Sequence, residues 1–580
     1  MKPTASAHFR YWPVLFASSL SMPALASEDN DILFDGIVSE LDRTMAVLST
    51  AEQPPYWIGM GVIDRQTVSL TATHGAASTP DIRHQRLGDV DVRVGTFQLD
   101  NTHKIRDAGW FDAPERFGLS LPLEDDADLI RRATWKATDD TYRAAVRRFI
   151  KVQTNHAVKV AREDGSDDFS KAPAIVDVQD VQRVDFDTTE WLEIVRNTSA
   201  RFLDHPAVHD SNVTLRVQDD VRYIVTTDGT RIRDQRVNIR VSIWAMTTAE
   251  DGQELQVYDH IDTATLAGLP SADRVAEMVD GVAAKVTALR TAPVVDPYVG
   301  PAILRGRAAA VFFHEILGHR AEGHRQKDED EGQTLTDKIG EQIFPAFIHV
   351  HDDPTLDRWG EQDLNGHYIY DDEGVAAQRV PIIEDGILQG FLMSRAPIEG
   401  TAVSNGHGRR QPGNAPVARQ GNLVVSADNG IPYAELREQL IQRVQAEDKP
   451  FGLIFDDISG GFTLTGRGIP NSYAVQPVTV WRVWPDGRPD ELVRGVDLIG
   501  TPLVTFNRIV GASDTTQVFT GMCGAESGWV PVSAIAPDLL VSELEVQRRE
   551  KQNDRPPLLE PPAAVKLPPK AAGSAMRGGQ

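Results

Sequence analysis

Two histidines and a glutamate stand close together near the middle of the chain, in the run HEILGH at residues 314–319. Neutral imidazoles are good zinc ligands, and a glutamate beside the first ligand can take a proton from a water on the zinc. These residue types therefore indicate a zinc hydrolase site, with His314 and His319 as ligands and Glu315 as the catalytic base.

The spacing of the two histidines constrains the helix that carries them. In the common zinc motif the histidines are four residues apart on one helical face. Here they are five apart, and at 3.6 residues per turn the second is turned by ~140° from the first. The spacing predicts that the helix ends or bulges between them, and Gly318 tolerates such a distortion.

Two histidines do not complete a catalytic zinc site, because three protein ligands and a water are usual. The third ligand is Cys523, in the glycine-flanked run GMCGAESGWVPVS, or a carboxylate such as Glu322 or Asp328. Cys523 is the chain's single cysteine, so the alternative is a lone buried thiol. His324 is a further candidate ligand, although a solvated surface histidine is the simpler interpretation.

Length and composition describe an acidic globular protein. The chain has 580 residues, of which 41% are hydrophobic and 25% charged, and its formal net charge is −25. This length exceeds a single core, so two or more domains are expected. A chain this acidic is not expected to bind nucleic acid through a broad basic surface.

The N-terminus has the pattern of a secretory signal peptide over residues 1–26. Lys2 and Arg10 form the positive region, an apolar run begins at Pro13, and Ala24-Leu25-Ala26 offers a cleavage site. No later segment approaches the ~20 apolar residues of a membrane span. We therefore expect an exported, periplasmic protein without a membrane span.

Hydrophobic periodicity predicts an α+β protein with two domains. The N-terminal domain, residues 27–290, is predicted to be of α/β type, with a mixed sheet, helices and a helical segment at about 121–170. Asp228-Gly229 predicts a tight hairpin turn within it. The Pro-containing stretch 291–301 predicts a connection. A strand-rich domain, residues 302–547, carries the metal helix, and the Pro-rich tail 548–580 is predicted to be disordered.

Four further residues are candidates for substrate binding. Arg409 and Arg410, in GHGRR, can bind a peptide carboxylate bidentately, or form an ordinary solvated basic loop. Gly460 and Gly461 allow a strand edge to approach a peptide backbone, as in β-addition, or form an ordinary turn.

Several motifs in order resemble the TldD/PmbA family of metallopeptidases, in particular its TldD-like, zinc-bearing branch. The metal run continues as HEILGHRAEGH, and the later blocks are IYDDEGVAAQRVPIIEDGILQGFLMSR, SNGHGRRQPGNAPVARQGNLVV, FDDISGGFTL, VRGVDLIGTPL and MCGAESGWVPVSAIAPDLLVSELEV. The resemblance covers about residues 300–547. The first half is similar only weakly, through TTDGTRIRDQRVNIRVSI, and the segment from roughly 120 to 215 has no clear counterpart.

This resemblance implies zinc held by His314, His319 and Cys523, with Glu315 as catalytic base. It also implies hydrolysis of small or unfolded peptides, and a dimer with a second copy or with a metal-free PmbA-like subunit. The family is mostly cytoplasmic, whereas this chain has a signal-like N-terminus.

Two other functions remain open. HEILGH is also similar to the metal helix of dipeptidyl peptidase III enzymes, but these need a glutamate ligand from a second helix, and the glycine-rich strand blocks do not fit them. A peptide-binding scaffold subunit like the PmbA branch needs none of His314, Glu315, His319 and Cys523.

Cleavage of the predicted signal peptide would leave Ser27 at the mature N-terminus, because Ala24 and Ala26 supply the small residues that the peptidase recognises. N-terminal sequencing of protein from the native cell should find Ser27 or a residue within a few positions of it. Recovery of the intact N-terminus would contradict export.

Overall fold

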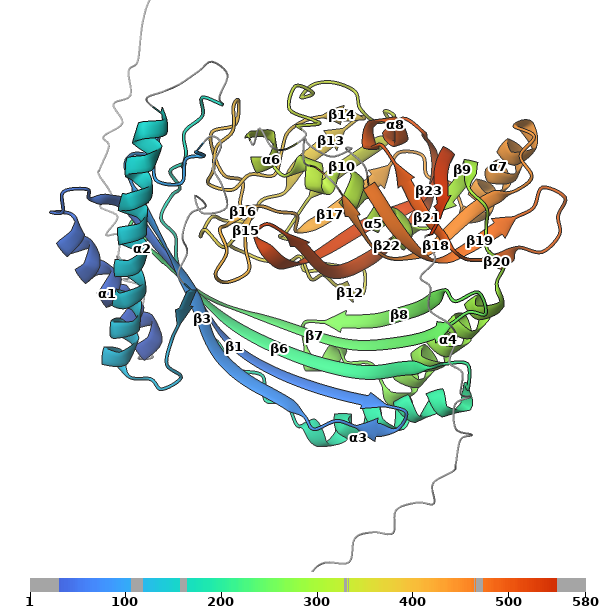
Figure 1. The fold of residues 1–580 in the computed structure, drawn as a ribbon, viewed down its shortest axis with the longest axis horizontal. Coiled ribbons are helices and arrows are strands. Elements are labelled where there is room, and N and C mark those ends of the chain that lie inside the picture. Colours follow the sequence, from blue (N-terminus) through green and yellow to red (C-terminus); the bar gives the residue numbers. More distant parts are fainter. Residues whose placement is uncertain are drawn as a thin grey trace, which may run out of the picture.

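The computed structural model describes residues 31–105, 118–156, 164–327, 331, 333–463, 465 and 473–549. The predicted signal peptide and almost all of the predicted tail lie outside these residues, as does Asp328. Two large sheets face one another, and helices cover the outer side of the first (Figure 1). The fold class is α+β, as the sequence predicts. No helix in the described part is long and apolar enough to cross a membrane.

The first sheet has eight strands in the order β4-β3-β1-β6-β7-β5, with β2 paired to β1 and β8 to β7. Its strands are β1 (Pro55–Thr73), β2 (Ala76–Ala77), β3 (Asp81–Val94), β4 (Gly118–Ser120), β5 (Val176–Val178), β6 (Asp210–Thr226), β7 (Arg231–Thr248) and β8 (Glu254–Thr263). The turn at Asp228-Gly229 joins β6 to β7, which confirms the predicted hairpin, and Gly229 has the positive φ of 101° that such a turn requires.

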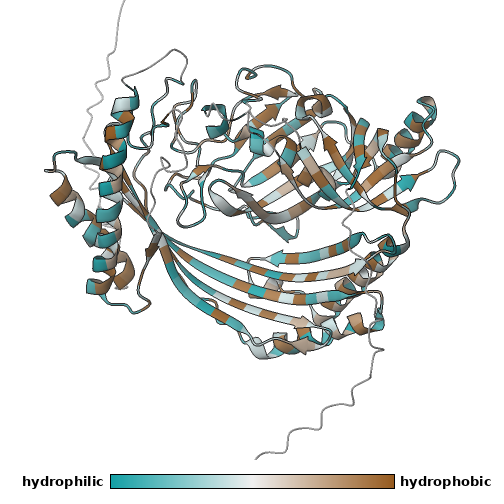
Figure 2. Cartoon of the chain, in the orientation of Figure 1, coloured by the Kyte–Doolittle hydropathy of each residue, from teal (hydrophilic) through white to brown (hydrophobic). Residues whose placement is uncertain are grey.

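One face of this sheet is apolar along its whole length. Alternate side chains of β6, with the exception of Asp219, are buried apolar residues on this face: Leu215, Val217, Val221, Tyr223 and Val225. They pack against α1 (Ile32–Leu48), α2 (Ala127–His156), α3 (Thr188–Ser199) and α4 (Ala272–Thr291). The alternation is visible as bands along the strands in Figure 2. The opposite, polar face of the sheet is therefore turned toward the second sheet.

The second sheet has eleven strands in the order β14-β13-β10-β17-β23-β21-β19-β18-β9, with β20 paired to β19 and β22 to β23. Its strands are β9 (Tyr298–Leu304), β10 (Ile348–Asp352), β13 (Val380–Glu384), β14 (Ile387–Leu388), β17 (Asn422–Ala427), β18 (Gly452–Thr463), β19 (Tyr473–Val483), β20 (Glu491–Val493), β21 (Val496–Gly500), β22 (Ile509–Ala525) and β23 (Gly528–Arg548). Because β23 also pairs with β9, five of the strands close into a ring.

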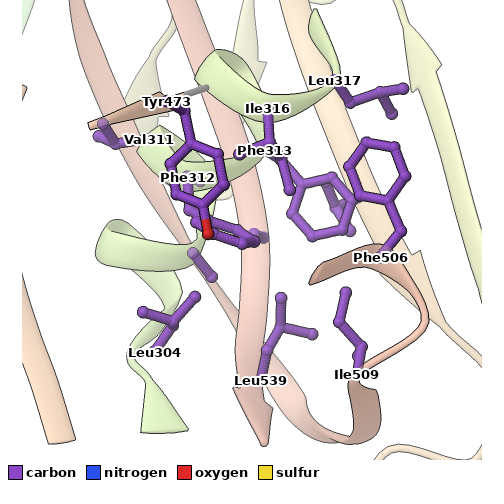
Figure 3. Close-up of a cluster of buried hydrophobic side chains, with 14 of the residues drawn as sticks. Leu304, Val311, Phe312, Phe313, Ile316, Leu317, Tyr473, Phe506, Ile509 and Leu539 are labelled. Atoms are coloured by element: carbon purple, nitrogen blue, oxygen red, sulfur yellow. The ribbon is translucent and has the colours of Figure 1, made fainter. Parts of the chain in front are cut away.

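Smaller elements complete this half. They are α5 (Gly306–Ile316), α6 (His324–Lys327), α7 (Tyr433–Ala446), α8 (Pro502–Phe506), the 3-10 helix η4 (Gly318–Ala321), the ribbon β11 (Arg358–Trp359) with β12 (Gln362–Asp363), and the ribbon β15 (Gly408–Arg409) with β16 (Val417–Ala418). The 3-10 helices η2 (Ala200–Asp204) and η3 (Leu266–Gly268) belong to the first half. Ten of the eleven residues of α5 are buried. A helix that is apolar on all sides needs a complete protein environment. Leu304, Phe313 and Leu539 belong to the core around it (Figure 3).

The two halves are joined through buried charged groups. Arg395 is only 2% exposed and donates to the Ser170 carbonyl at 3.0 and 2.9 Å, and to Asp228 at 3.2 Å. Lys327 donates to the Asp167 carbonyl at 3.0 Å. The chain around 167–170, part of the segment without a counterpart in the resemblance, therefore crosses onto the half that carries the metal helix.

Candidate metal centre

The helix that carries His314 ends before it reaches His319. The last residue of α5 is Ile316, Leu317 has φ −113°, and the chain continues as the 3-10 helix η4. This confirms the predicted break, which takes the form of a helix end. At Gly318 an added Cβ would lie 1.9 Å from Gln420 Oε1, so a side chain at this position would displace Gln420.

Cys523 meets both histidines. It lies on β22, and its Sγ is 3.2 Å from His314 Nε2 and 3.4 Å from His319 Nε2. All three side chains are buried, with exposures of 5% or 6%. The three ligand atoms lie within 4.8 Å of one another. Nitrogen and sulfur ligands of a tetrahedral zinc are roughly 3.5 Å apart, so the spacing and the types of donor fit zinc.

The other candidate ligands lie elsewhere. Glu322 accepts a hydrogen bond from Nδ1 of His319 at 3.2 Å, on the nitrogen that does not face Cys523. In the neutral imidazole this carboxylate favours the tautomer in which Nε2 of His319 has the lone pair, as carboxylates behind zinc-binding histidines commonly do. His324 pairs with Glu526 instead of facing the cluster. Sequence reasoning considered Glu322 only as a direct ligand and missed this role.

The charges of the cluster reinforce one another. Burial alone would raise the pKa of the Cys523 thiol, but His319 and His314 lower it well below its usual range. Burial would lower the pKa of His319, yet Cys523 and Glu322 raise it well above its usual value. The thiol is thus held in the thiolate form, which is the form that binds metals.

Glu315 lies beside the cluster in a confined position. It is 6% exposed, and its burial raises its pKa. Gly461 of β18 lies against it, because a Cβ added at Gly461 would be 2.8 Å from Cγ of Glu315 and 3.1 Å from the Ala474 carbonyl oxygen. Gly460, by contrast, has open space where a Cβ would stand. Of the two glycines, Gly461 therefore contacts the candidate base.

The structure does not bring the two arginines of GHGRR to the cluster. Arg409 is buried, donates to the Gln420 carbonyl, and stacks over the Tyr368 ring at 4.8 Å. Arg410 pairs with Asp89 on β3 and thus joins the two halves. Both side chains are engaged in internal contacts.

Apolar side chains are also exposed on β22, β23 and β18, on the faces opposite to Cys523 and Gly461. Met522, which precedes Cys523, is 49% exposed, and Trp529, opposite Gly524 in the same hairpin, is 60% exposed. Phe462, which follows Gly461, is 50% exposed.

If Cys523 binds zinc, the metal should protect its thiolate. In the zinc-loaded protein the thiol should react slowly with a maleimide, and it should react faster once a chelator has removed the metal. The measurement is a labelling time course with and without chelator, with circular dichroism to show that the fold persists and an unfolded sample to give the total thiol. Equally slow labelling in both samples would show that Cys523 is buried but not a ligand.

Comparison with known proteins agrees with this geometry. Residues 298–548 match the PmbA/TldA metallopeptidase C-terminal domain. A metalloprotease TldD homolog of Haemophilus influenzae is 28% identical over 62% of this chain and 71% of its own length. A metalloprotease of Methanothermobacter thermautotrophicus is 30% identical over 40% of this chain and 46% of its own length, so the match spans about half of that relative.

Among solved structures, TldE from Thermococcus kodakarensis shares the fold, with a TM-score of 0.57 at 14% identity over 88% of this chain and all of that chain. The matched residues 298–548 contain both histidines, Glu315 and Cys523. Residues 298–548 therefore form a C-terminal domain of the PmbA/TldD family of metallopeptidases.

Proposed function

We propose that this protein is a zinc-dependent peptidase of the TldD-like branch that hydrolyses small or unfolded peptides outside the cytoplasm. The observation that carries the proposal is the meeting of His314, His319 and Cys523, with Glu315 beside them. The names of the relatives, which are metalloproteases, support a peptidase reaction.

The residues of the centre have distinct roles in this proposal. His314, His319 and Cys523 would hold zinc, which when bound polarises the scissile carbonyl and makes its water more acidic. Glu315 takes the proton of the attacking water and passes it to the leaving amine. Its pKa, raised by burial, suits a group that must both accept and release a proton.

The surroundings of the centre support peptides as substrates. Met522 and Trp529 on the β22–β23 hairpin, which carries Cys523, and Phe462 on β18, which carries Gly461, are exposed apolar side chains. Unfolded peptides expose the apolar side chains that folded proteins bury. Within the described residues, β18 pairs with β9 only over Leu453–Phe455, so its second half, which includes Gly460 and Gly461, has an edge available for a peptide strand.

The two alternatives have less support. A dipeptidyl peptidase III-like site needs a glutamate from a second helix, whereas the third group here is a cysteine from a strand. A scaffold subunit of the PmbA type would share the fold, because the matched domain is described as common to PmbA and TldA. It would have no use for a buried thiolate between two histidines and a confined glutamate.

Replacement of the base tests the proposal directly. Glu315→Gln preserves size but cannot accept a proton, so peptidase activity on an unfolded peptide should fall about 10²–10⁴-fold while zinc content is unchanged. Glu438→Gln, on the exposed side of α7, is the matched control and should retain full activity. Near-normal turnover by Glu315→Gln would refute the assignment of the base.

The contact between Gly461 and Glu315 gives a second test. Gly461→Ala places a methyl group 2.8 Å from Cγ of Glu315, and displacement of the base by about 1 Å should lower kcat about 10²-fold. Zinc binding should persist, since no ligand moves. Gly281→Ala, on α4 with no atom near the added methyl, is the control. Unchanged kcat in Gly461→Ala would show that Glu315 tolerates displacement or is not the base.

A further inference from the structure

Arg419 is a completely buried arginine behind the metal centre. It follows the short strand β16, and its exposed fraction is 0%. A buried guanidinium is costly unless its donors are all engaged. The groups that Arg419 contacts therefore indicate its structural role.

One side of the guanidinium faces the segment of α5 and η4 that carries His314 and His319. Nε of Arg419 lies 3.3 Å from Oε1 of Glu322, which is also fully buried, and the two groups form an ion pair without a hydrogen bond between these atoms. The other oxygen of Glu322 accepts the hydrogen bond from Nδ1 of His319. Arg419 thus reaches His319 through one carboxylate.

The other side of the guanidinium faces the β22–β23 hairpin, which carries Cys523. Arg419 Nη2 donates to the Cys523 carbonyl at 2.8 Å, and Nη1 donates to Oγ of Ser527 at 2.8 Å and to the Gly528 carbonyl at 3.1 Å. Ser527 lies in the turn between β22 and β23, and Gly528 is the first residue of β23. The same side chain therefore holds the strand of the third ligand at the ligand itself and at its turn.

We propose that Arg419 is a positioning residue that sets the distance between Cys523 and the two histidines. It acts through Glu322 on the side of the histidines and through the β22–β23 hairpin on the side of Cys523. This inference rests on the proposed function, since it concerns how tightly the centre holds zinc. It adds a residue that touches neither the metal nor the substrate.

The shape of the arginine, and not only its charge, carries this role. The planar guanidinium donates to one hydroxyl and two carbonyls at fixed angles while its charge pairs with the carboxylate, whereas lysine has a single ammonium group. Arg325 also pairs with Glu322, at 2.9 Å, and with Glu526 of the hairpin turn. Glu322 therefore keeps a cation beside it when Arg419 is replaced, so the loss of affinity would report geometry.

Arg419→Lys separates geometry from charge. Its zinc dissociation constant, measured by competition with a chromogenic chelator, should rise about 10–100-fold, the usual effect of losing a group behind a metal ligand. The rate at which the chelator removes zinc should rise as well. In the cobalt-loaded variant, the thiolate-to-cobalt absorption should shift or weaken because Cys523 is no longer held in place.

The matched control is Arg395→Lys, at an arginine that is likewise buried, with 2% exposure, and donates twice to the Ser170 carbonyl, but joins the two halves of the chain. It should lower thermal stability without changing zinc affinity or the cobalt spectrum. Should Arg419→Lys fail to fold, Ser527→Ala removes one acceptor of the same guanidinium, and a few-fold loss of affinity is expected.

The outcomes are distinct. Wild-type affinity and spectrum in a folded Arg419→Lys protein, or equal losses in Arg395→Lys, would overturn the positioning role while the proposed function stands. An unchanged affinity in Ser527→Ala, where that variant is needed, would also overturn it. Failure of the wild-type protein to bind zinc would overturn both.

Discussion

The pairing of β23 with two strands at once sets the geometry of the metal centre. On one side β23 pairs with β9, the strand from which the chain enters α5 and reaches His314. Toward the hairpin turn it pairs with β22, where Cys523 stands opposite Val530. A slip of one residue in either register would turn the alternate side chains to the other face. Met522 would then face α5, and the thiol would point away from the histidines.

The same arrangement explains why so many charges are buried behind the centre. A thiolate and two carboxylates in a protein interior are unfavourable unless cations lie beside them. Although burial raises the pKa of Glu322, His319 and Arg325 lower it well below its usual range, so it remains a carboxylate. Arginines flank this carboxylate on both sides. The interior is thus prepared for a cation at the position where the three ligand atoms converge.

The parts of this picture that the sequence predicted are those decided locally. The helix end between His314 and His319 follows from the angle per residue, and the hairpin at Asp228-Gly229 follows from turn chemistry. The choice among Cys523, Glu322 and Asp328 stayed open on spacing alone, and only the family resemblance favoured Cys523. The contact between Cys523 and His319 joins residues 204 positions apart, and strand register decides such a contact. Residue patterns within one segment carry no information about it.

The two adjacent glycines show the same limit at shorter range. Gly460 and Gly461 are equivalent in the sequence, but alternate residues of a strand face opposite sides. Only Gly461 is turned toward α5, where its missing side chain leaves room for Glu315. The base is therefore confined by α5, on which it stands, and by β18, and the same confinement keeps it dry enough to raise its pKa. The confinement of Glu315 between α5 and β18 thus determines both the position of its carboxylate and its raised pKa. A change that opens the space around Glu315 would alter both.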